Sequence, residues 1–337
     1  MAEQALPPQA EIFHIIGGYW LSRAVYLAAR LKIADAVGDG GATLESVAAA
    51  TATRPEALRR LLRALTAHRI FRESGGRYSQ TPLSETLRSG RPGSMRAIAE
   101  AELGHDHYES WGDVESCLKK DGTAFERRYG MPVFRYYAAR PALEAMFAEA
   151  MTNLTAIAHA GILGTYRFQG FRRAVDVGGG HGAFLAAILD QNPAAEGVVF
   201  DQPSVIAEAA KLEHVQRFGG RLTTVGGDFF DAVPAGGDLY LLKFVLHDWD
   251  DANAARLLAN LRKAIAPTGR LAVVELVLPP PNEPHIGPLM DLNMMVMTGG
   301  VERSGAEYGD LLAKSGFRVE RVVPTHSPFS VVEAVPV

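Results

Sequence analysis

The feature that most constrains the fold of this chain is a run of glycines between an apolar strand pattern and a helix pattern. Residues 175–183 read VDVGGGHGA. Glycines after a strand permit a tight turn and a close backbone approach to a ligand, and the helix that follows begins with unpaired N–H groups. The segment predicts the first strand, turn and helix of a nucleotide-binding α/β domain; a glycine turn with only a structural role is the alternative interpretation.

The second half of the chain continues as an alternation of strand and helix patterns. Apolar strand patterns follow at residues 198–200, 222–225, 239–245 and 271–278, and helix patterns at 183–189, 205–212 and 252–266. Such alternation is typical of a parallel sheet with right-handed crossovers. Residues 317–323 and 329–334 predict an antiparallel hairpin that closes the sheet edge. The predicted fold class is therefore α/β, with a Rossmann-like, mostly parallel sheet.

The first half of the chain has an almost entirely helical pattern. We expect one helix over residues 8–37, with a stripe formed by Ile12, Ile15, Ile16, Tyr19 and Trp20. This apolar stripe is too large for a lone solvated helix, so it should pack against its own domain or a second subunit. Residues 43–83 then predict a winged helix: a short helix capped by Thr43, a second that starts at Pro55, and a hairpin around Gly75-Gly76.

Composition and charge narrow the class of protein. Arg54, Arg59, Arg60 and Arg63 on the predicted second helix could contact DNA or form a solvated face; we expect the latter and no nucleic-acid partner, because the net charge is −4. Cys117 is the only cysteine, which favours a reducing cytoplasm. We expect neither a signal peptide in residues 1–11 nor a membrane-spanning segment. The length suggests about two domains, and the patterns divide the chain into a helical winged-helix part over 1–100, a helical linker over 101–165 and an α/β part over 166–337.

Three acids suggest how a cofactor is held. Asp201 lies about twenty residues after the glycines, where an acid binds ribose hydroxyls. Asp228 could accept a hydrogen bond from an adenine amino group while Phe229 covers the ring. Asp176 precedes the glycines, and a carboxylate there suits a cationic, phosphate-free ligand such as S-adenosylmethionine better than a pyrophosphate. The glycine motif alone does not separate S-adenosylmethionine from NAD.

A second polar cluster follows the strand pattern at 239–245. Residues 242–251 read LKFVLHDWDD, which places His247 at the carboxyl end of a strand, where open α/β sheets bind ligands. A histidine there is a usable base near neutral pH. The alternative is a structural histidine that caps the next helix, although Asp250 or Asp251 suits that role better. We expect no metal, because a histidine can deprotonate a hydroxyl without one.

Five motifs together resemble one enzyme family. VDVGGGHG, FDQP, GGDFF, LKFVLHDWDD and GGVERS are similar, in order and spacing, to the cation-independent O-methyltransferases, which act on caffeate, flavonoids, acetylserotonin and bacterial phenazines or polyketides. The similarity covers nearly the whole chain, and the bacterial secondary-metabolite branch is the closer match. It implies transfer of a methyl group from S-adenosyl-L-methionine to a hydroxyl of a small aromatic acceptor, with S-adenosyl-L-homocysteine as product and a homodimer as the assembly.

The resemblance also implies roles for individual residues. His247 looks like the catalytic base, and Glu302 and Glu275 look like the acids beside it; we expect Glu302 to fix the tautomer. The residues implied at the cofactor are Asp176, Gly178, Gly180, Asp201, Asp228, Phe229, Lys243 and Trp249. The residues implied at the acceptor are Phe147, Met151, Asp248, Asn293, Met294 and Met297, and ordinary core packing is the alternative for each methionine.

Three other functions remain open at this point. An N-methyltransferase on the same scaffold would not depend on His247. An NAD-dependent dehydrogenase is suggested by the glycine motif and Asp201 alone. A winged-helix regulator that senses S-adenosylmethionine is suggested by residues 43–83 and their arginines.

Overall fold

A computed structural model describes residues 7–91 and 93–337; residues 1–6, where no leader is expected, lie outside the described residues. The chain divides into two compact units. The smaller unit comprises residues up to 113 together with 133–156, and the larger comprises 114–132 together with 157–337. The long helix α11, Pro141–Thr165, contributes to both.

The smaller unit begins with two helices where the sequence predicted one. α1 spans Pro8–Arg30 and α2 spans Ile33–Val37. The prediction of a continuous helix over residues 8–37 was wrong, because Lys32 adopts a left-handed conformation with φ 52° that ends the first helix. Leu21, Ala24 and Val25 of α1 pack against the core of this unit.

A winged helix follows, as predicted. Thr43 caps α3, Leu44–Ala50, by accepting a hydrogen bond from the Ser46 N–H, and Pro55 opens α4, Pro55–Ala67. Strands β1 (Ala42–Thr43), β2 (Phe71–Ser74) and β3 (Arg77–Gln80) form a small sheet in the order β1-β3-β2. The other helices are α5 (Pro82–Glu85), α6 (Arg96–Glu102), α7 (His105–Trp111) and α10 (Val133–Ala138). Arg59, Arg60 and Arg63 are exposed on α4.

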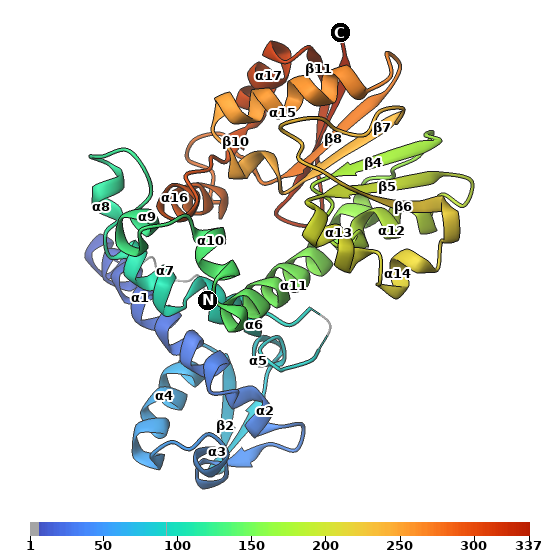
Figure 1. Cartoon of the computed structure of the whole chain (residues 1–337). Coiled ribbons are helices and arrows are strands. Elements are labelled where there is room, and N and C mark those ends of the chain that lie inside the picture. The colour runs from blue at the N-terminus through green and yellow to red at the C-terminus, as the bar shows by residue number, and fades with distance from the viewer. Residues whose placement is uncertain (1–6, 92) are drawn as a thin grey trace. The chain divides into compact units, whose positions relative to one another are not determined.

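The larger unit is built on a seven-stranded sheet in the order β11-β12-β8-β7-β4-β5-β6 (Figure 1). The strands are β4 (Arg173–Val177), β5 (Glu196–Asp201), β6 (Leu222–Gly226), β7 (Leu239–Lys243), β8 (Arg270–Glu275), β11 (Phe317–Pro324) and β12 (Ser330–Pro336). All neighbouring pairs are parallel except those of β12, which runs antiparallel to both β11 and β8. The predicted Rossmann-like class and closing hairpin are confirmed.

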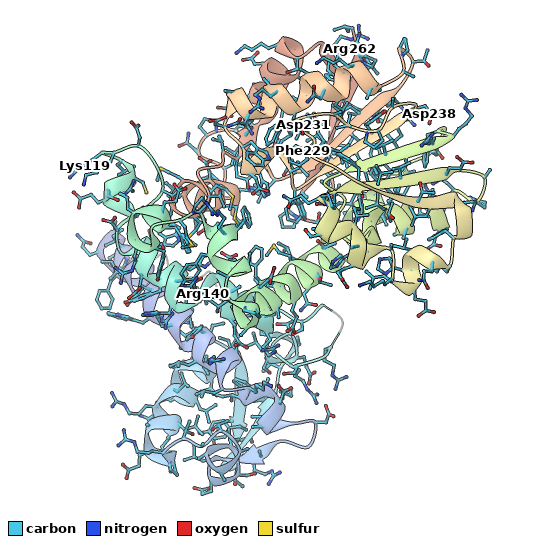
Figure 2. The ribbon with its side chains drawn as sticks, viewed as in Figure 1. Lys119, Arg140, Phe229, Asp231, Asp238 and Arg262 are labelled. Atoms are coloured by element: carbon cyan, nitrogen blue, oxygen red, sulfur yellow. The ribbon has the colours of Figure 1, made fainter. Side chains whose placement is uncertain are left out.

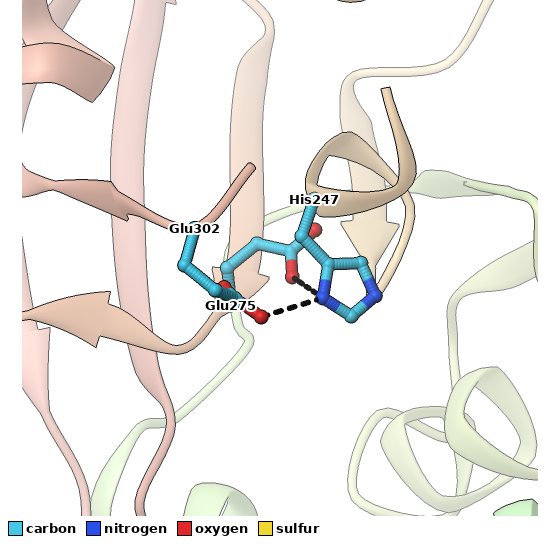
Figure 3. A group of neighbouring side chains, drawn as sticks. All are labelled: His247, Glu275 and Glu302. Atoms are coloured by element: carbon cyan, nitrogen blue, oxygen red, sulfur yellow. Dashed lines mark hydrogen bonds and ion pairs between the residues drawn. The ribbon is translucent and has the colours of Figure 1, made fainter. Parts of the chain in front are cut away.

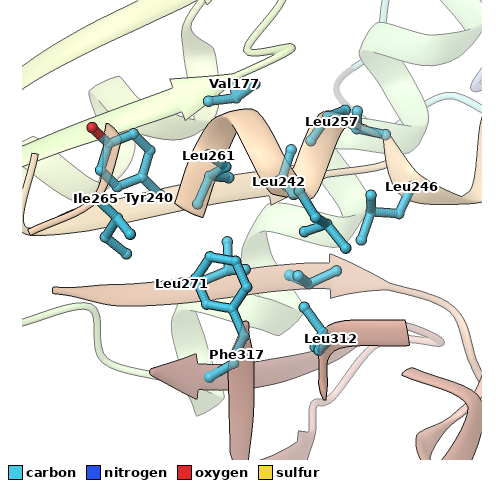
Figure 4. Close-up of a cluster of buried hydrophobic side chains, with 14 of the residues drawn as sticks. Val177, Tyr240, Leu242, Leu246, Leu257, Leu261, Ile265, Leu271, Leu312 and Phe317 are labelled. Atoms are coloured by element: carbon cyan, nitrogen blue, oxygen red, sulfur yellow. The ribbon is translucent and has the colours of Figure 1, made fainter. Parts of the chain in front are cut away.

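Helices follow most of the strands. Besides the end of α11, the helices of the larger unit are α8 (Val114–Cys117) and α9 (Ala124–Tyr129), which precede the sheet, and α12 (Ala183–Asp190), α13 (Pro203–Ala209), α14 (Glu213–Gln216), α15 (Asp251–Ala264), α16 (Gly287–Met297) and α17 (Gly305–Lys314). Short 3-10 turns occur at Gly219–Arg221 and Leu246–Asp248, and β9 (Val277–Leu278) pairs in parallel with β10 (Arg303–Ser304). Leu257 and Leu261 of α15 pack on Tyr240, Leu242 and other strand residues in one apolar cluster (Figure 4).

The alternation of side chains along the strands determines which residues reach the other face. Val175 and Val177 belong to the cluster under α15, so Asp176 points to the opposite face of β4. Asp176 pairs in register with Leu241 of β7, which places Lys243 on the same face as Asp176. The sheet therefore carries an acid and a lysine together on one face near the ends of two adjacent strands.

Across the described residues, no helix is both long enough and apolar enough to cross a membrane.

The amino-terminal part of α1 presents an uncovered apolar surface. Ile12, Phe13, Ile15, Ile16, Tyr19 and Trp20 are each at least half exposed. Because so large an apolar patch is unfavourable in water, we predict self-association through α1. Changing both Ile12 and Ile16 to Glu should shift the sedimentation coefficient at micromolar concentration toward the monomer. Leu118→Glu, at another exposed position, is the control; identical sedimentation of all three proteins would contradict the prediction.

Candidate active site

The segment that follows β7 is held in a strained conformation. Phe244 has φ 58°, a left-handed value that costs a residue other than glycine about 1–3 kcal/mol. A 3-10 turn at Leu246–Asp248 then presents His247, and Asp250 caps α15 by accepting a hydrogen bond from the Asn253 N–H at 2.8 Å. The cap belongs to Asp250, which leaves His247 free of that role.

Glu275, the last residue of β8, anchors the segment that follows β7. Its side chain is buried, and its Oε1 accepts hydrogen bonds from the backbone N–H groups of Val245 and Leu246, both at 2.9 Å. Its Oε2 has no hydrogen-bond partner and lies 3.8 Å from His247 Nδ1. Glu275 therefore positions the backbone before His247 and adds negative charge beside the ring.

Glu302 makes the direct hydrogen bond to the histidine. Its Oε1 lies 2.9 Å from His247 Nδ1, and Figure 3 shows the two carboxylates of Glu302 and Glu275 on the same side of the imidazole. A proton on Nδ1 leaves Nε2 as the nitrogen that can accept one. Asp248 Oδ1 lies 3.7 Å from that Nε2. The two acids thus make different contacts: Glu302 hydrogen-bonds to the ring, and Glu275 hydrogen-bonds to the backbone before it.

The charges around His247 favour its protonated form. Burial disfavours the imidazolium, but the surrounding carboxylates, Glu275 foremost, outweigh burial and raise the pKa of His247 to about 10. Burial raises the pKa of Glu275 to about 7, and the charge of His247 opposes that rise. A proton that reaches this cluster is therefore held strongly by the histidine.

Arg303 connects the segment that contains His247 to the segment that contains Glu302. The sequence did not predict this role. Its guanidinium is buried and donates to the carbonyl oxygens of Leu246 (3.1 Å), Val301 (3.2 Å) and Trp249 (2.9 Å). It also forms an ion pair with Asp251 at 2.8 Å. The only signal in the sequence was an arginine directly after Glu302 in GGVERS, and its contacts could not be read from that.

The backbone at Gly300 touches the backbone of His247. A Cβ at position 300 would lie 2.0 Å from the His247 carbonyl oxygen, which accepts a hydrogen bond from the Val301 N–H at 2.8 Å. Asp291 of α16 accepts a hydrogen bond from the Glu302 N–H at 2.9 Å. These contacts hold Glu302 at the distance from the ring that its hydrogen bond requires.

The glycine turn after β4 lies against the same segment. Gly178 has φ 72°, and a Cβ there would lie 2.7 Å from a methyl carbon of Val245, two residues before His247. The Gly180 N–H donates to Asp201 Oδ2 at 2.8 Å, which joins the turn to the end of β5. Because the carboxyl ends of β4 and β7 are adjacent, the turn and the histidine occupy one edge of the sheet.

Asp176 and Lys243 place opposite charges beneath this turn. Both carboxylate oxygens of Asp176 are buried without a hydrogen-bond partner. Burial raises the pKa of Asp176 to about 7, against the opposing charge of Lys243. Burial also lowers the pKa of Lys243, against the charge of Asp176. A buried acid without a partner beneath a glycine cradle fits a cationic ligand.

The remaining predicted cofactor residues follow β6 and β7. Asp228 Oδ1 accepts a hydrogen bond from the Phe230 N–H at 2.8 Å. Phe229 and Phe230 pack edge-to-face on each other and on Trp249, with ring centroids 4.8–6.0 Å apart. Figure 2 shows Phe229 on the side where the strands end and Asp238 before the amino end of β7.

The predicted acceptor residues belong to different units. Asn293, Met294 and Met297 lie on α16 of the larger unit, where Asn293 and Met297 are buried. Phe147 and Met151 lie in the smaller unit. There the ring of Phe147 contacts Phe134 and Tyr137, and Met151 packs against a cluster formed by Ala97, Ala101 and Ala150.

The histidine and its two acids also have the spacing of a metal site. Ligand atoms of His247, Glu275 and Glu302 all lie within 4.8 Å of one another. In this arrangement, however, Glu275 Oε1 already accepts two backbone hydrogen bonds, and Glu302 hydrogen-bonds to the ring. The contacts that the structure shows are therefore hydrogen bonds of the two acids to backbone N–H groups and to the imidazole ring.

Comparison with known proteins agrees with this geometry. A family model described as an O-methyltransferase domain matches residues 111–318, and one described as an O-methyltransferase dimerisation domain matches residues 13–90. This chain belongs to the O-methyltransferase family. The family methylates acceptors with S-adenosylmethionine, and its dimerisation domain supports a homodimer.

Curated relatives and solved structures are similar to this chain over nearly its whole length. The chain is 42% identical to phenazine O-methyltransferase PhzM of Lysobacter antibioticus, over 99% of this chain and 98% of that protein. It is 33% identical to the phenazine-1-carboxylate N-methyltransferase of Pseudomonas aeruginosa, over 96% of each chain. The crystal structure of CalO1, a calicheamicin-biosynthesis methyltransferase with bound S-adenosylhomocysteine, superposes with a TM-score of 0.89 at 32% identity, over 99% of this chain and 100% of that one.

The close approach of Gly300 to the His247 carbonyl oxygen provides a test of how Glu302 is positioned. Gly300→Ala should lower kcat by about 100-fold, because an added methyl group forces the Glu302 segment away from the His247 carbonyl. Gly309→Ala, in α17 with open space around it, is the control and should leave activity unchanged. Steady-state methyl transfer measures both; equal activity of the two variants would contradict the proposed contact.

The pKa of Asp176 predicts proton release on cofactor binding. A cationic ligand beside this carboxyl group lowers its pKa from about 7, so binding near pH 7 should release a fraction of a proton and tighten as the pH rises toward 7. Calorimetry in two buffers of different ionisation enthalpy measures the release. Asp176→Asn should abolish it, and release that persists in this variant would assign the proton to another group.

Proposed function

We propose that His247 removes the proton from a hydroxyl group of a small aromatic acceptor while that oxygen receives the methyl group. The observation that carries the proposal is the hydrogen bond of 2.9 Å between Glu302 and His247 Nδ1, beside the glycine turn. It leaves Nε2 as the nitrogen that takes the proton. Such an arrangement fixes both the tautomer and the orientation of a general base.

S-adenosylmethionine supplies an electrophilic methyl group and leaves as S-adenosylhomocysteine. The residues proposed to hold it are Asp176, Gly178, Gly180, Asp201, Asp228, Phe229, Lys243 and Trp249. The unpartnered carboxylate of Asp176 supports this assignment, because the ligand carries positive charge. The Gly178 and Gly180 conformations, both with positive φ, keep side chains out of the cradle.

The energetics of deprotonation depend on the protonation state of the histidine. A phenol has a pKa of about 10, by analogy with tyrosine, and the pKa of His247 is raised to about 10. Proton transfer from a phenol to the neutral ring therefore costs almost no free energy, but at pH 7 the ring must first lose its own proton, which costs about 4 kcal/mol. The carboxylates thus make the neutral form of His247 a strong base, and the supply of that form increases as the pH rises.

The acceptor is proposed to be a small aromatic secondary metabolite. Names of relatives refer to phenazines, demethylpuromycin and 3-amino-4-hydroxybenzoate. Asn293 offers an amide to an acceptor oxygen, and Met294 and Met297 offer soft apolar contacts to a ring. Asp248 is also proposed to contact the acceptor; Phe147 and Met151, in the smaller unit, stay sequence-based predictions. The names of these relatives support a role in antibiotic or related biosynthesis, and the single Cys117 supports a reducing cytoplasm as the location.

The reaction is proposed to need no metal. His247 and its acids already provide a base and its orientation. Dialysis against EDTA should therefore leave the rate of methyl transfer unchanged. Loss of activity that added Mg²⁺ or Zn²⁺ restores would instead assign the three side chains to a metal ion.

The N-methyl alternative rests on the similarity to the phenazine-1-carboxylate N-methyltransferase. A ring nitrogen with a lone pair has no proton to lose, so an N-methyl acceptor would not need the His247 base. The dependence of activity on His247 therefore separates the two reactions.

The central prediction concerns acceptors of different acidity. His247→Asn should reduce methyl transfer to a phenol of ordinary pKa by about 10²–10⁴-fold, and should affect much less an acidic phenol that is already ionised at the assay pH. Rates for a series of substituted phenols measure this difference. His326→Asn, an exposed histidine on the loop before β12, is the matched control. A loss that is equal for every phenol would contradict the role of base.

A further inference from the structure

His159 is a polar residue of the larger unit to which the mechanism gives no role. It lies near the end of α11, and its ring is 4.7 Å from the ring of Phe184, at 34° to it. Its Nε2 is buried and has no hydrogen-bond partner. An unsatisfied buried polar group costs about 1–3 kcal/mol, so the position calls for an explanation.

The residue that His159 contacts begins the helix after the glycine turn. Phe184 is the second residue of α12, whose N-cap is Gly182, with φ 77° and no side chain to cap the helix. The first N–H groups of a helix lack partners within it and carry partial positive charge. Ala183, the first residue, is exposed. His159 therefore lies against a helix end that favours a negatively charged group.

Charged side chains extend this arrangement. Lys243 Nζ lies 5.8 Å from the centre of the same Phe184 ring, and its charge acts on both His159 and Asp176. Asp176, buried and without a partner, lies 2.9 Å from the Cβ position of Gly179. The side chains near the glycine turn thus provide the positive charge of Lys243, the ring nitrogen of His159 and the carboxylate of Asp176. This pattern fits the two charges of an α-amino acid.

We infer that His159 binds the cofactor, with its Nε2–H donating a hydrogen bond to the α-carboxylate of S-adenosylmethionine while Asp176 receives the α-ammonium group. Burial and the charge of Lys243 lower the pKa of His159 to about 3, so the ring is neutral and can carry its proton on Nε2. The inference rests on the proposed function, since it requires that this chain bind S-adenosylmethionine. A purely structural His159 would only stack on Phe184, and phenylalanine would serve equally well.

The test uses His159→Phe, which keeps an aromatic ring against Phe184 and removes the nitrogen. Calorimetry should show S-adenosylhomocysteine binding weakened by a factor of about 10 to 100, the loss expected for a hydrogen bond to a charged group. Decarboxylated S-adenosylmethionine and 5′-methylthioadenosine lack the carboxylate. The His159→Phe variant should therefore bind these two ligands as tightly as the wild-type protein does. His159→Gln, which restores an N–H donor, should recover part of the affinity for S-adenosylhomocysteine.

The remaining outcomes separate the two claims. Equal losses for all three ligands, or no loss for any, would overturn the role of His159 and leave the proposed function standing. A wild-type protein that binds no S-adenosylhomocysteine would overturn the proposed function and this inference with it. Circular dichroism and the thermal midpoint of His159→Phe establish that the variant is folded, so a general loss of structure is distinguished from a loss of one contact.

Discussion

The hydrogen bonds from two backbone N–H groups to Glu275 are the contacts on which the site depends. They bind the segment that contains Val245 and Leu246 to the end of β8, immediately before His247. The strain at Phe244 can persist only because such contacts compensate for it. Without them, the segment before His247 would lose its connection to β8, and the distance between His247 and Glu302 would be less well fixed.

Two features of the sheet bring the cofactor cradle and the base together. β4 and β7 are parallel neighbours, so the glycine turn and the histidine segment leave the sheet at the same edge. Gly178 then lets the turn pack directly on Val245. Arg303 and Gly300 attach the segment that contains Glu302 to the same His247 segment. The base is thus positioned by three separate stretches of chain.

Much of this could be predicted from the sequence, and the exceptions have physical causes. Strand and helix periodicity gave the sheet, because burial of alternating residues imposes a pattern that is local in sequence. The break at Lys32 was missed, since a left-handed lysine leaves no such pattern. The sequence favoured Glu302 over Glu275 only through the family resemblance, and their different contacts could not be read from it, because a contact that spans 55 residues depends on the register of distant strands. Arg303 and His159 were missed for the same reason: each acts through tertiary contacts with no local signature.

The claim that carboxylates make His247 a strong, oriented base is tested most directly by its titration. NMR of ¹⁵N-histidine-labelled protein follows the ring nitrogens of His247, which His247→Asn identifies by loss of their signals. We expect an imidazolium that persists far above pH 6.5, toward pH 10, and a clearly lower titration midpoint in Glu302→Gln. A midpoint near 6.5 that Glu302→Gln leaves unchanged would contradict the claim that the carboxylates raise the pKa of His247.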